Sequence, residues 1–91
     1  MRASASHILC PTEADCLAVK AEIEGGKSFA DAAREHSGCP SSASGGELGT
    51  FGKGQMVREF EEVVFSGPVG EVLGPVKTDF GYHLILITQR G

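Results

Sequence analysis

The segment at residues 45–54 constrains this chain most, because five of its ten residues are glycine. Glycine allows turns and close backbone approaches that residues with a Cβ resist, so the segment predicts a long loop with a brief strand near Thr50-Phe51. It leads directly into Met56 and Phe60, which stand at helical spacing. With His7 and His83 far away in the sequence, this order predicts an apolar pocket beside a pair of histidines.

The length and composition favour one small domain spanning residues 1–91. A chain of this size has a core only just large enough for independent folding, which leaves no room for a second domain. No apolar stretch approaches the length of a membrane span, and the first ten residues hold no hydrophobic signal region. We therefore expect a cytoplasmic protein, or one in an organelle interior if a presequence has been removed.

Charge and cysteine content exclude several classes of partner and cofactor. The formal charge is −4 without any Lys/Arg cluster, which argues against a nucleic-acid or anionic-membrane surface. Cys10, Cys16 and Cys39 are odd in number and form no C-x-x-C pair, so reduced thiols are expected. The histidines and cysteines also lack metal-ligand spacing. We expect neither a metal nor another cofactor.

Apolar periodicity and turn residues predict a small α+β domain with a short antiparallel sheet and helices around it. The predicted elements are a strand at 3–9, a helix from Thr12 to the glycines at 25–26, a helix from Ser28 to 37–38, the brief strand near 50–51, a helix at 57–65, an edge strand at 72–78 and a central strand at 83–88. Ala5, His7 and Leu9 share one strand face, as do His83, Ile85 and Ile87.

The two predicted central strands carry one histidine each. If these strands pair with His7 and His83 on the same face, the imidazoles come within hydrogen-bonding reach of each other or of a shared hydroxyl such as that of Thr78. The sequence permits this pairing without establishing it.

Four ordered motifs resemble the parvulin family of peptidyl-prolyl cis/trans isomerases. They are Ser6-His7-Ile8-Leu9, Gly45-Gly46-Glu47-Leu48-Gly49-Thr50-Phe51, Gly54-Gln55-Met56-Val57 with Phe60, and the closing segment at 74–85 that contains Phe80-Gly81-Tyr82-His83. Together they cover essentially the whole chain. The resemblance implies a four-stranded antiparallel sheet surrounded by three to four helices.

The resemblance also implies two groups of site residues. The substrate-binding group holds the proline ring and its surroundings: Leu48, Gln55, Met56, Phe60 and Phe80. The catalytic group is the hydrogen-bonded histidine pair with two neighbours: His7, Cys39, Thr78 and His83. A free-standing, cofactor-free monomer that binds proline-containing polypeptides is expected.

The connection after the first strand bears on substrate choice. In Pin-type parvulins, this connection is a loop rich in Lys and Arg that binds phosphoserine or phosphothreonine before proline. Here residues 10–19 include Glu13 and Asp15 and no basic residue before Lys20. Dianion recognition needs cationic donors, so we predict no preference for phosphorylated substrates.

The implied reaction is rotation about an Xaa-Pro amide, whose barrier of about 18–20 kcal/mol comes from partial double-bond character. No bond breaks. A thousandfold to millionfold acceleration needs only about 4–8 kcal/mol of differential binding to the twisted amide. An apolar site contributes by disfavouring the charge-separated planar form.

Several alternatives stay open at the level of the sequence. Met56 and Phe60 taken alone fit a core as well as a pocket, and the histidines can support the scaffold rather than transfer protons. The whole chain can be a peptide-binding or holdase module with little turnover. It can also be a thiol-dependent redox or transferase protein centred on Cys39, although no resolving cysteine stands beside it.

Overall fold

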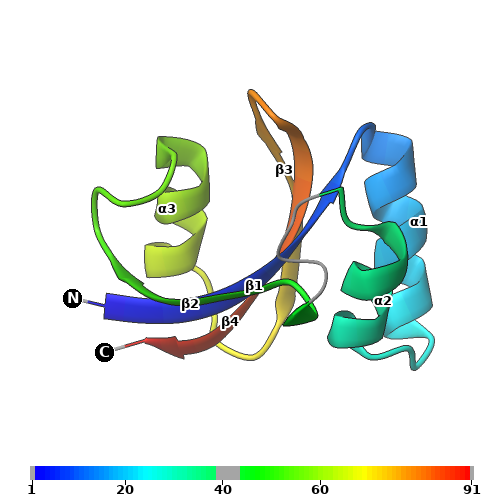
Figure 1. Cartoon of the computed structure of the whole chain (residues 1–91), viewed down its shortest axis with the longest axis horizontal. Helices are drawn as coiled ribbons and strands as arrows, with labels where there is room; N and C mark the ends of the chain where they lie inside the picture. The colour runs from blue at the N-terminus through cyan, green and yellow to red at the C-terminus, as the bar shows by residue number, and fades with distance from the viewer. Residues whose placement is uncertain (1, 39–43, 91) are drawn as a thin grey trace.

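The computed structural model describes residues 2–38 and 44–90 and contains an antiparallel sheet flanked by helices (Figure 1). The elements are β1 (Arg2–Cys10), α1 (Glu13–Glu24), α2 (Phe29–His36), β2 (Glu47–Gly52), α3 (Arg58–Ser66), β3 (Val72–Thr78) and β4 (Gly81–Arg90). Four strands form the sheet in the order β2-β1-β4-β3. The predicted α+β class and the four-stranded sheet are confirmed.

Helix starts follow the predicted capping residues. The Thr12 hydroxyl accepts the Asp15 backbone N–H at 3.2 Å, and the Ser28 hydroxyl accepts that of Asp31 at 3.1 Å. Val57 is the N-cap residue of α3, and its side chain forms no capping hydrogen bond. Within the ranges 2–38 and 44–90, no helix has the length and apolar character that crossing a membrane requires.

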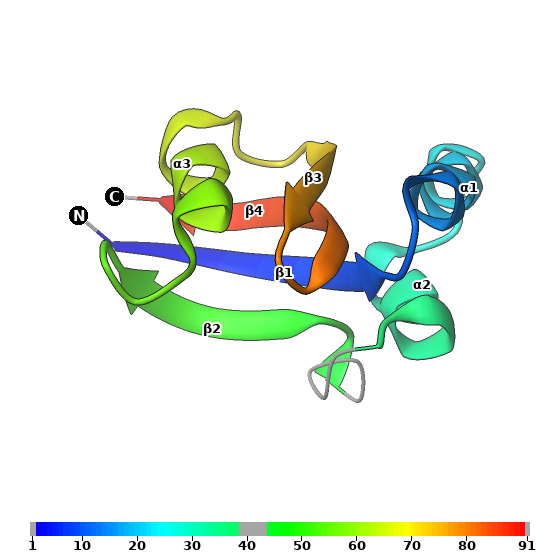
Figure 2. The same ribbon diagram turned by 90° about the horizontal axis from the view of Figure 1, so that it is seen from above.

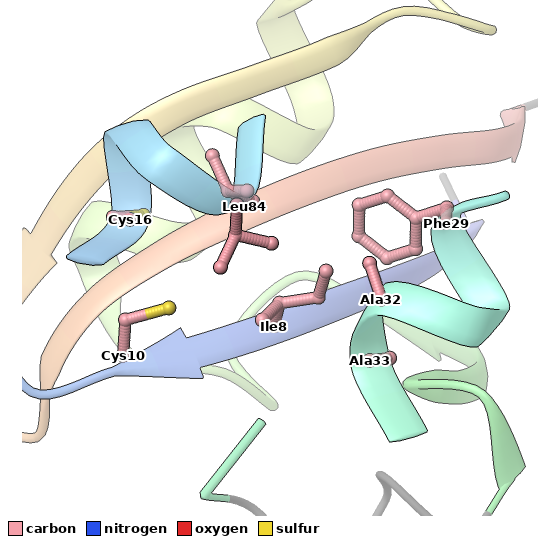
Figure 3. Packing of buried hydrophobic residues seen from close by; sticks show 8 residues of the cluster. Ile8, Cys10, Cys16, Phe29, Ala32, Ala33 and Leu84 are labelled. Atoms are coloured by element: carbon pink, nitrogen blue, oxygen red, sulfur yellow. The ribbon is translucent and has the colours of Figure 1, made fainter. Parts of the chain in front are cut away.

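The two faces of the sheet bury different helices. Figure 1 and Figure 2 show α3 on one side of the sheet, with α1 and α2 on the other. Alternation along the central strands explains this division, because neighbouring residues such as Leu84 and Ile85 point to opposite faces. Ile8 and Leu84 pack against α1 and α2 (Figure 3), while Ile85 and Ile87 pack with Phe60 of α3.

β1 and β4 are the central strands, as predicted. They pair along their lengths with His7 opposite Ile85 and Leu9 opposite His83. β3 lies at the sheet edge, which fits Pro75, because proline cannot donate a ladder hydrogen bond. β2 is longer than the predicted brief strand. It pairs antiparallel with the first part of β1, from Arg2 opposite Gly52 to Ser6 opposite Glu47.

Residues that precede β2 in the chain continue the hydrogen bonding along the edge of β1 that faces away from β4. The Gly46 carbonyl accepts the His7 N–H at 2.9 Å. The Leu9 N–H then donates to the Ser37 hydroxyl at 3.1 Å, and the Leu9 carbonyl accepts the Gly38 N–H at 2.9 Å. β1 is therefore fixed on both sides where it carries His7 and Leu9.

Candidate active site

The strand register brings His7 and His83 together. Because His7 faces Ile85 and His83 faces Leu9 across the β1–β4 pair, the two histidines are diagonal neighbours on one face of the sheet. Their Nδ1 atoms lie 3.1 Å apart, and their rings are nearly parallel, with an interplanar angle of 15° and centroids 5.3 Å apart. Both side chains are buried, with 6% of His7 and 4% of His83 exposed.

Thr78 extends this contact into a chain of hydrogen bonds. Its buried hydroxyl lies 2.7 Å from His83 Nε2 and accepts the Phe80 backbone N–H at 3.2 Å. A hydrogen bond between two Nδ1 atoms needs one N–H and one lone pair, so only one of the two Nδ1 atoms carries a proton. The predicted grouping of His7, Thr78 and His83 is observed, and Cys39 lies outside the described residues.

Both imidazoles are neutral at physiological pH. Burial, and to a smaller degree the charge of His83, lower the pKa of His7 from 6.5 to about 4. Burial also lowers the pKa of His83. The pair therefore offers neutral donors and acceptors to its surroundings rather than a positive charge.

The lowered imidazole pKa values predict loss of stability in mild acid. The unfolded chain binds a proton at its ordinary histidine pKa near 6.5, whereas the folded chain holds His7 neutral down to about 4. The contribution of the neutral imidazoles to the free energy of unfolding is therefore complete above pH 6.5. It falls toward pH 4, with a slope of up to about 1.4 kcal/mol per pH unit for each imidazole. Denaturant unfolding at half-unit pH steps measures this slope.

Two variants isolate the contribution of the pair. His7→Leu removes one titrating group and flattens the curve between pH 6.5 and 4.5. His36→Gln removes an exposed imidazole that lies outside the pair and serves as the control. If the unfolding free energy of His7→Leu depends on pH as steeply as that of the unmodified chain, the pH dependence does not come from the histidine pair.

An apolar pocket with a volume of about 240 Å³ opens beside the histidine pair. It is lined by residues from β1, β2, the loop before α3, α3, and the β3–β4 hairpin: His7, Leu9, Leu48, Met56, Val57, Phe60, Phe80 and His83. The predicted pocket residues Leu48, Met56, Phe60 and Phe80 all lie in this lining.

Phe60 belongs to the core and to the pocket at once. Its side chain is 3% exposed and packs in the cluster under α3. The ring also stands edge-to-face against both imidazoles, with centroid distances of 5.7 Å to His7 and 5.9 Å to His83. The sequence left open whether Phe60 is a core residue or a pocket residue, and in the structure it is both.

Gln55 lies outside the pocket lining, unlike the other predicted substrate contacts. Its side-chain carbonyl accepts the Gly52 N–H at 2.6 Å, and the Glu61 carboxylate accepts the Gly54 N–H. Both side chains hold the turn that leads into Met56. Hydrogen bonding to this turn accounts for the position of Gln55, because the exposed backbone amides of a tight turn need acceptors.

Sequence reasoning missed two residues of the lining, Leu9 and Val57. A signal was present for Leu9, because it alternates with His7 along β1 and so faces the same side. Val57 stands at the position before the first residue of α3, with 40% of its surface exposed. No periodicity marks a residue in that position.

The remaining thiols face the opposite core. Cys10 and Cys16 are buried, and their thiols hydrogen-bond to each other. Burial raises the pKa of both, that of Cys16 to about 12, so they stay protonated and unreactive at neutral pH. Within the described part of the chain, no group of three or more His, Cys, Asp or Glu side chains is arranged to hold a metal ion.

The four-stranded sheet with an apolar pocket beside a buried histidine pair agrees with what the resemblance to the parvulin family implies. The chain matches the model of the family described as Rotamase, PPIC-type PPIASE domain, over residues 7–89. It therefore belongs to the PPIC-type, or parvulin, family of peptidyl-prolyl isomerases. The resemblance, the fold and the isomerase class inferred from the sequence are confirmed.

Three known proteins illustrate the relationship. The foldase protein PrsA of Geobacillus kaustophilus is 52% identical over 87 residues, which are 94% of this chain and 31% of that protein. The crystal structure of PrsA from Bacillus subtilis is 39% identical with a TM-score of 0.93, covering 98% of this chain and 35% of that one. NmPin, the parvulin of Nitrosopumilus maritimus, is 40% identical with a TM-score of 0.84 and 94% coverage of both chains. The chain thus spans about a third of the length of the PrsA relatives.

Proposed function

We propose that this domain isomerises unphosphorylated Xaa-Pro bonds without forming a covalent intermediate. The observation that supports this most is the apolar pocket of about 240 Å³ beside two neutral imidazoles. A pocket of this character accepts a pyrrolidine ring and excludes water from the amide next to it.

In this proposal the pocket acts on the amide by holding one side of it. Leu48, Met56 and Phe60 grip the ring while the preceding carbonyl turns. Transfer of the amide to an apolar site disfavours its planar, charge-separated form. About 4–8 kcal/mol of preferential binding to the twisted form gives a thousandfold to millionfold acceleration.

The histidine pair then serves to shape and orient the pocket. Rotation about an amide transfers no proton, so the reaction needs no general acid or base. The nearly parallel imidazoles form a wall against which Phe60 packs edge-to-face. Thr78 bonds to His83 Nε2 and sets the orientation of that ring.

The charges near the end of β1 support a substrate without phosphate. The residues that follow β1 include Pro11, Glu13 and Asp15 and no cation before Lys20. The Lys20 ammonium donates to the Gly74 carbonyl at 2.9 Å. A phosphate dianion would find carboxylates there instead of the cationic donors that it requires.

Two-dimensional exchange NMR on a short Xaa-Pro peptide and its phosphoserine counterpart tests the proposal. Spontaneous isomerisation takes roughly tens of seconds or longer, so cross-peaks at mixing times below one second come from catalysis. We expect such cross-peaks for the plain peptide and none stronger for the phosphorylated one. A clear preference for the phosphopeptide would overturn the proposed specificity.

A holdase with little turnover is the second candidate. The exposed ring of Phe80 at the pocket is suited to gripping an apolar segment. Chemical-shift changes on peptide addition without any exchange cross-peaks would favour this candidate over the isomerase. The monomeric state and the cytoplasmic location stay predictions.

A further inference from the structure

The edge strand β3 carries one residue more than the stretch of β4 with which it pairs. Leu73 lies opposite Ile85 and Val76 lies opposite His83, so the three steps from 73 to 76 match only the two from 85 to 83. A strand pair with such an extra residue contains a β-bulge, and side chains beyond a bulge alternate one position later than before it. The bulge in β3 lies at Gly74-Pro75.

The bulge decides which residue of β3 faces the histidine pair. Leu73 packs on the side of the sheet that α3 covers, and regular alternation would then place residues 75, 77 and 79 on that side. With the extra residue, Val76 and Thr78 lie there instead, and the Thr78 hydroxyl comes within 2.7 Å of His83 Nε2. The hydrogen bond between Thr78 and His83 therefore depends on the bulge.

The backbone of the bulge packs directly on the strand that bears the second imidazole. A Cβ at Gly74 would lie 2.5 Å from the carbonyl oxygen of His83, so the two backbones are in close contact. Pro75 has no N–H, which leaves the bulge with fewer backbone hydrogen bonds than a regular strand. Its position consequently needs support from outside the sheet.

This support comes from the opposite side of the sheet. Lys20 belongs to α1, which covers the face away from α3 (Figure 2), and its ammonium donates to the Gly74 carbonyl at 2.9 Å. Within residues 2–38 and 44–90, no ion pair includes Lys20. A hydrogen bond from a charged donor is stronger than one between neutral groups, so this contact can fix the bulge.

We propose that Lys20 is a positioning residue of the active site, which fixes the β3 bulge and, through it, the orientation of His83. The contacts run from the Lys20 ammonium to the Gly74 carbonyl, along β3 to Thr78, and from the Thr78 hydroxyl to His83 Nε2. Lys20 does not line the proline pocket, so it acts only through these contacts. The inference rests on the proposed function, because it concerns the wall against which the substrate amide turns.

Lys20→Met and Lys20→Arg test this assignment. Methionine keeps an unbranched apolar stem and removes the ammonium, whereas arginine keeps a charged donor. The measured quantities are the nitrogen chemical shift of His83 Nε2, and kcat and KM from exchange NMR at a temperature where every variant is folded. In Lys20→Met we expect the His83 resonance to move and kcat to fall about tenfold, because a displaced group loses its effect on the twisted amide. KM should change little, since the residues that grip the proline ring stay in place. Lys20→Arg should restore most of kcat and of the resonance position.

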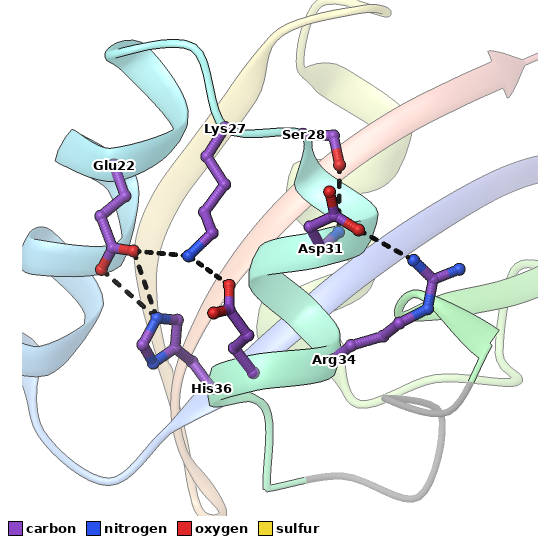
Figure 4. A network of polar contacts seen from close by, with 7 residues as sticks. Glu22, Lys27, Ser28, Asp31, Arg34 and His36 are labelled. Atoms are coloured by element: carbon purple, nitrogen blue, oxygen red, sulfur yellow. Dashed lines mark hydrogen bonds and ion pairs between the residues drawn. The ribbon is translucent and has the colours of Figure 1, made fainter.

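Lys27→Met is the matched control. Lys27 follows α1 and pairs with Glu22 and Glu35 (Figure 4), so its ammonium supports α1 and α2 instead of β3. The same substitution there removes one positive charge near the same helix. We expect kcat and the His83 resonance to remain those of the unmodified chain.

Three results would overturn the assignment. The first is an equal fall of kcat in Lys20→Met and Lys27→Met, because the stability of α1 would then be the cause. The second is an unmoved His83 resonance in Lys20→Met, and the third is a moved resonance with kcat unchanged. If the unmodified domain accelerates no peptide, the proposed function itself fails. In that case the His83 resonance alone decides whether Lys20 fixes the contact between Thr78 and His83.

Discussion

Replacing Phe60 with alanine should lower the free energy of unfolding by about 3–5 kcal/mol, the usual range for a buried phenylalanine, and remove most isomerase activity. Both effects have the same origin, because the ring fills the core under α3 and forms the pocket wall against the histidine pair. The two edge-to-face contacts with His7 and His83 are lost together. Denaturant unfolding and exchange NMR on one sample measure both quantities.

Phe60→Ala brings a domain of this size close to unfolding, since the total free energy of unfolding of small domains is only about 5–15 kcal/mol. Phe60→Leu keeps most of the buried volume and provides a folded variant for kinetics. Phe65→Ala is the matched control, because Phe65 lies on the same helix and contacts Phe51 but does not line the pocket. We expect it to lose stability with kcat/KM retained.

The decisive comparison is kcat/KM in Phe60→Leu against Phe65→Ala at temperatures where both are fully folded. A drop confined to Phe60→Leu supports a ring that touches substrate. Equal activity in the two variants would mean that Phe60 acts only through the core, contrary to its position in the pocket lining.

Local chemistry in the sequence was sufficient to predict most of the architecture. Thr12 and Ser28 indicated where two helices start, because each hydroxyl accepts a backbone N–H from the first turn of its helix. The alternation grouped His7 with Ala5 and His83 with Ile85, and the structure places these groups on the face that α3 covers. These signals are local, so a single sequence contains them.

Other parts of the site depend on relationships that no local pattern records. The β1–β4 register decides that His7 and His83 are diagonal neighbours, and only the folded sheet fixes that register. Gln55 lies outside the pocket lining because its side chain turns back to the Gly52 N–H, which is a matter of turn geometry. Val57 joins the pocket through the angle at which the chain enters α3.

Gly46→Ala should disturb the histidine pair from outside the pocket. Gly46 has a φ of +83°, and a Cβ there would overlap the carbonyl oxygen of His7 and lie 3.1 Å from the Ala33 Cβ. The backbone carbonyl of a central strand cannot move aside cheaply. Adding the cost of the left-handed conformation to that of overpacking gives a loss of about 2–5 kcal/mol in unfolding free energy.

Gly49→Ala separates the two costs. Gly49 has a similar φ of +77°, but a Cβ there meets nothing within 4 Å. It should lose only the conformational part, about 1–2 kcal/mol, and keep its kcat/KM. Gly46→Ala should also lose activity, because the clash pushes β1 at the residue that bears one imidazole and because the Gly46 carbonyl bonds the His7 N–H. Equal stability losses in the two variants, with activity kept in both, would show that β1 tolerates displacement there and that the position of His7 is not critical for turnover.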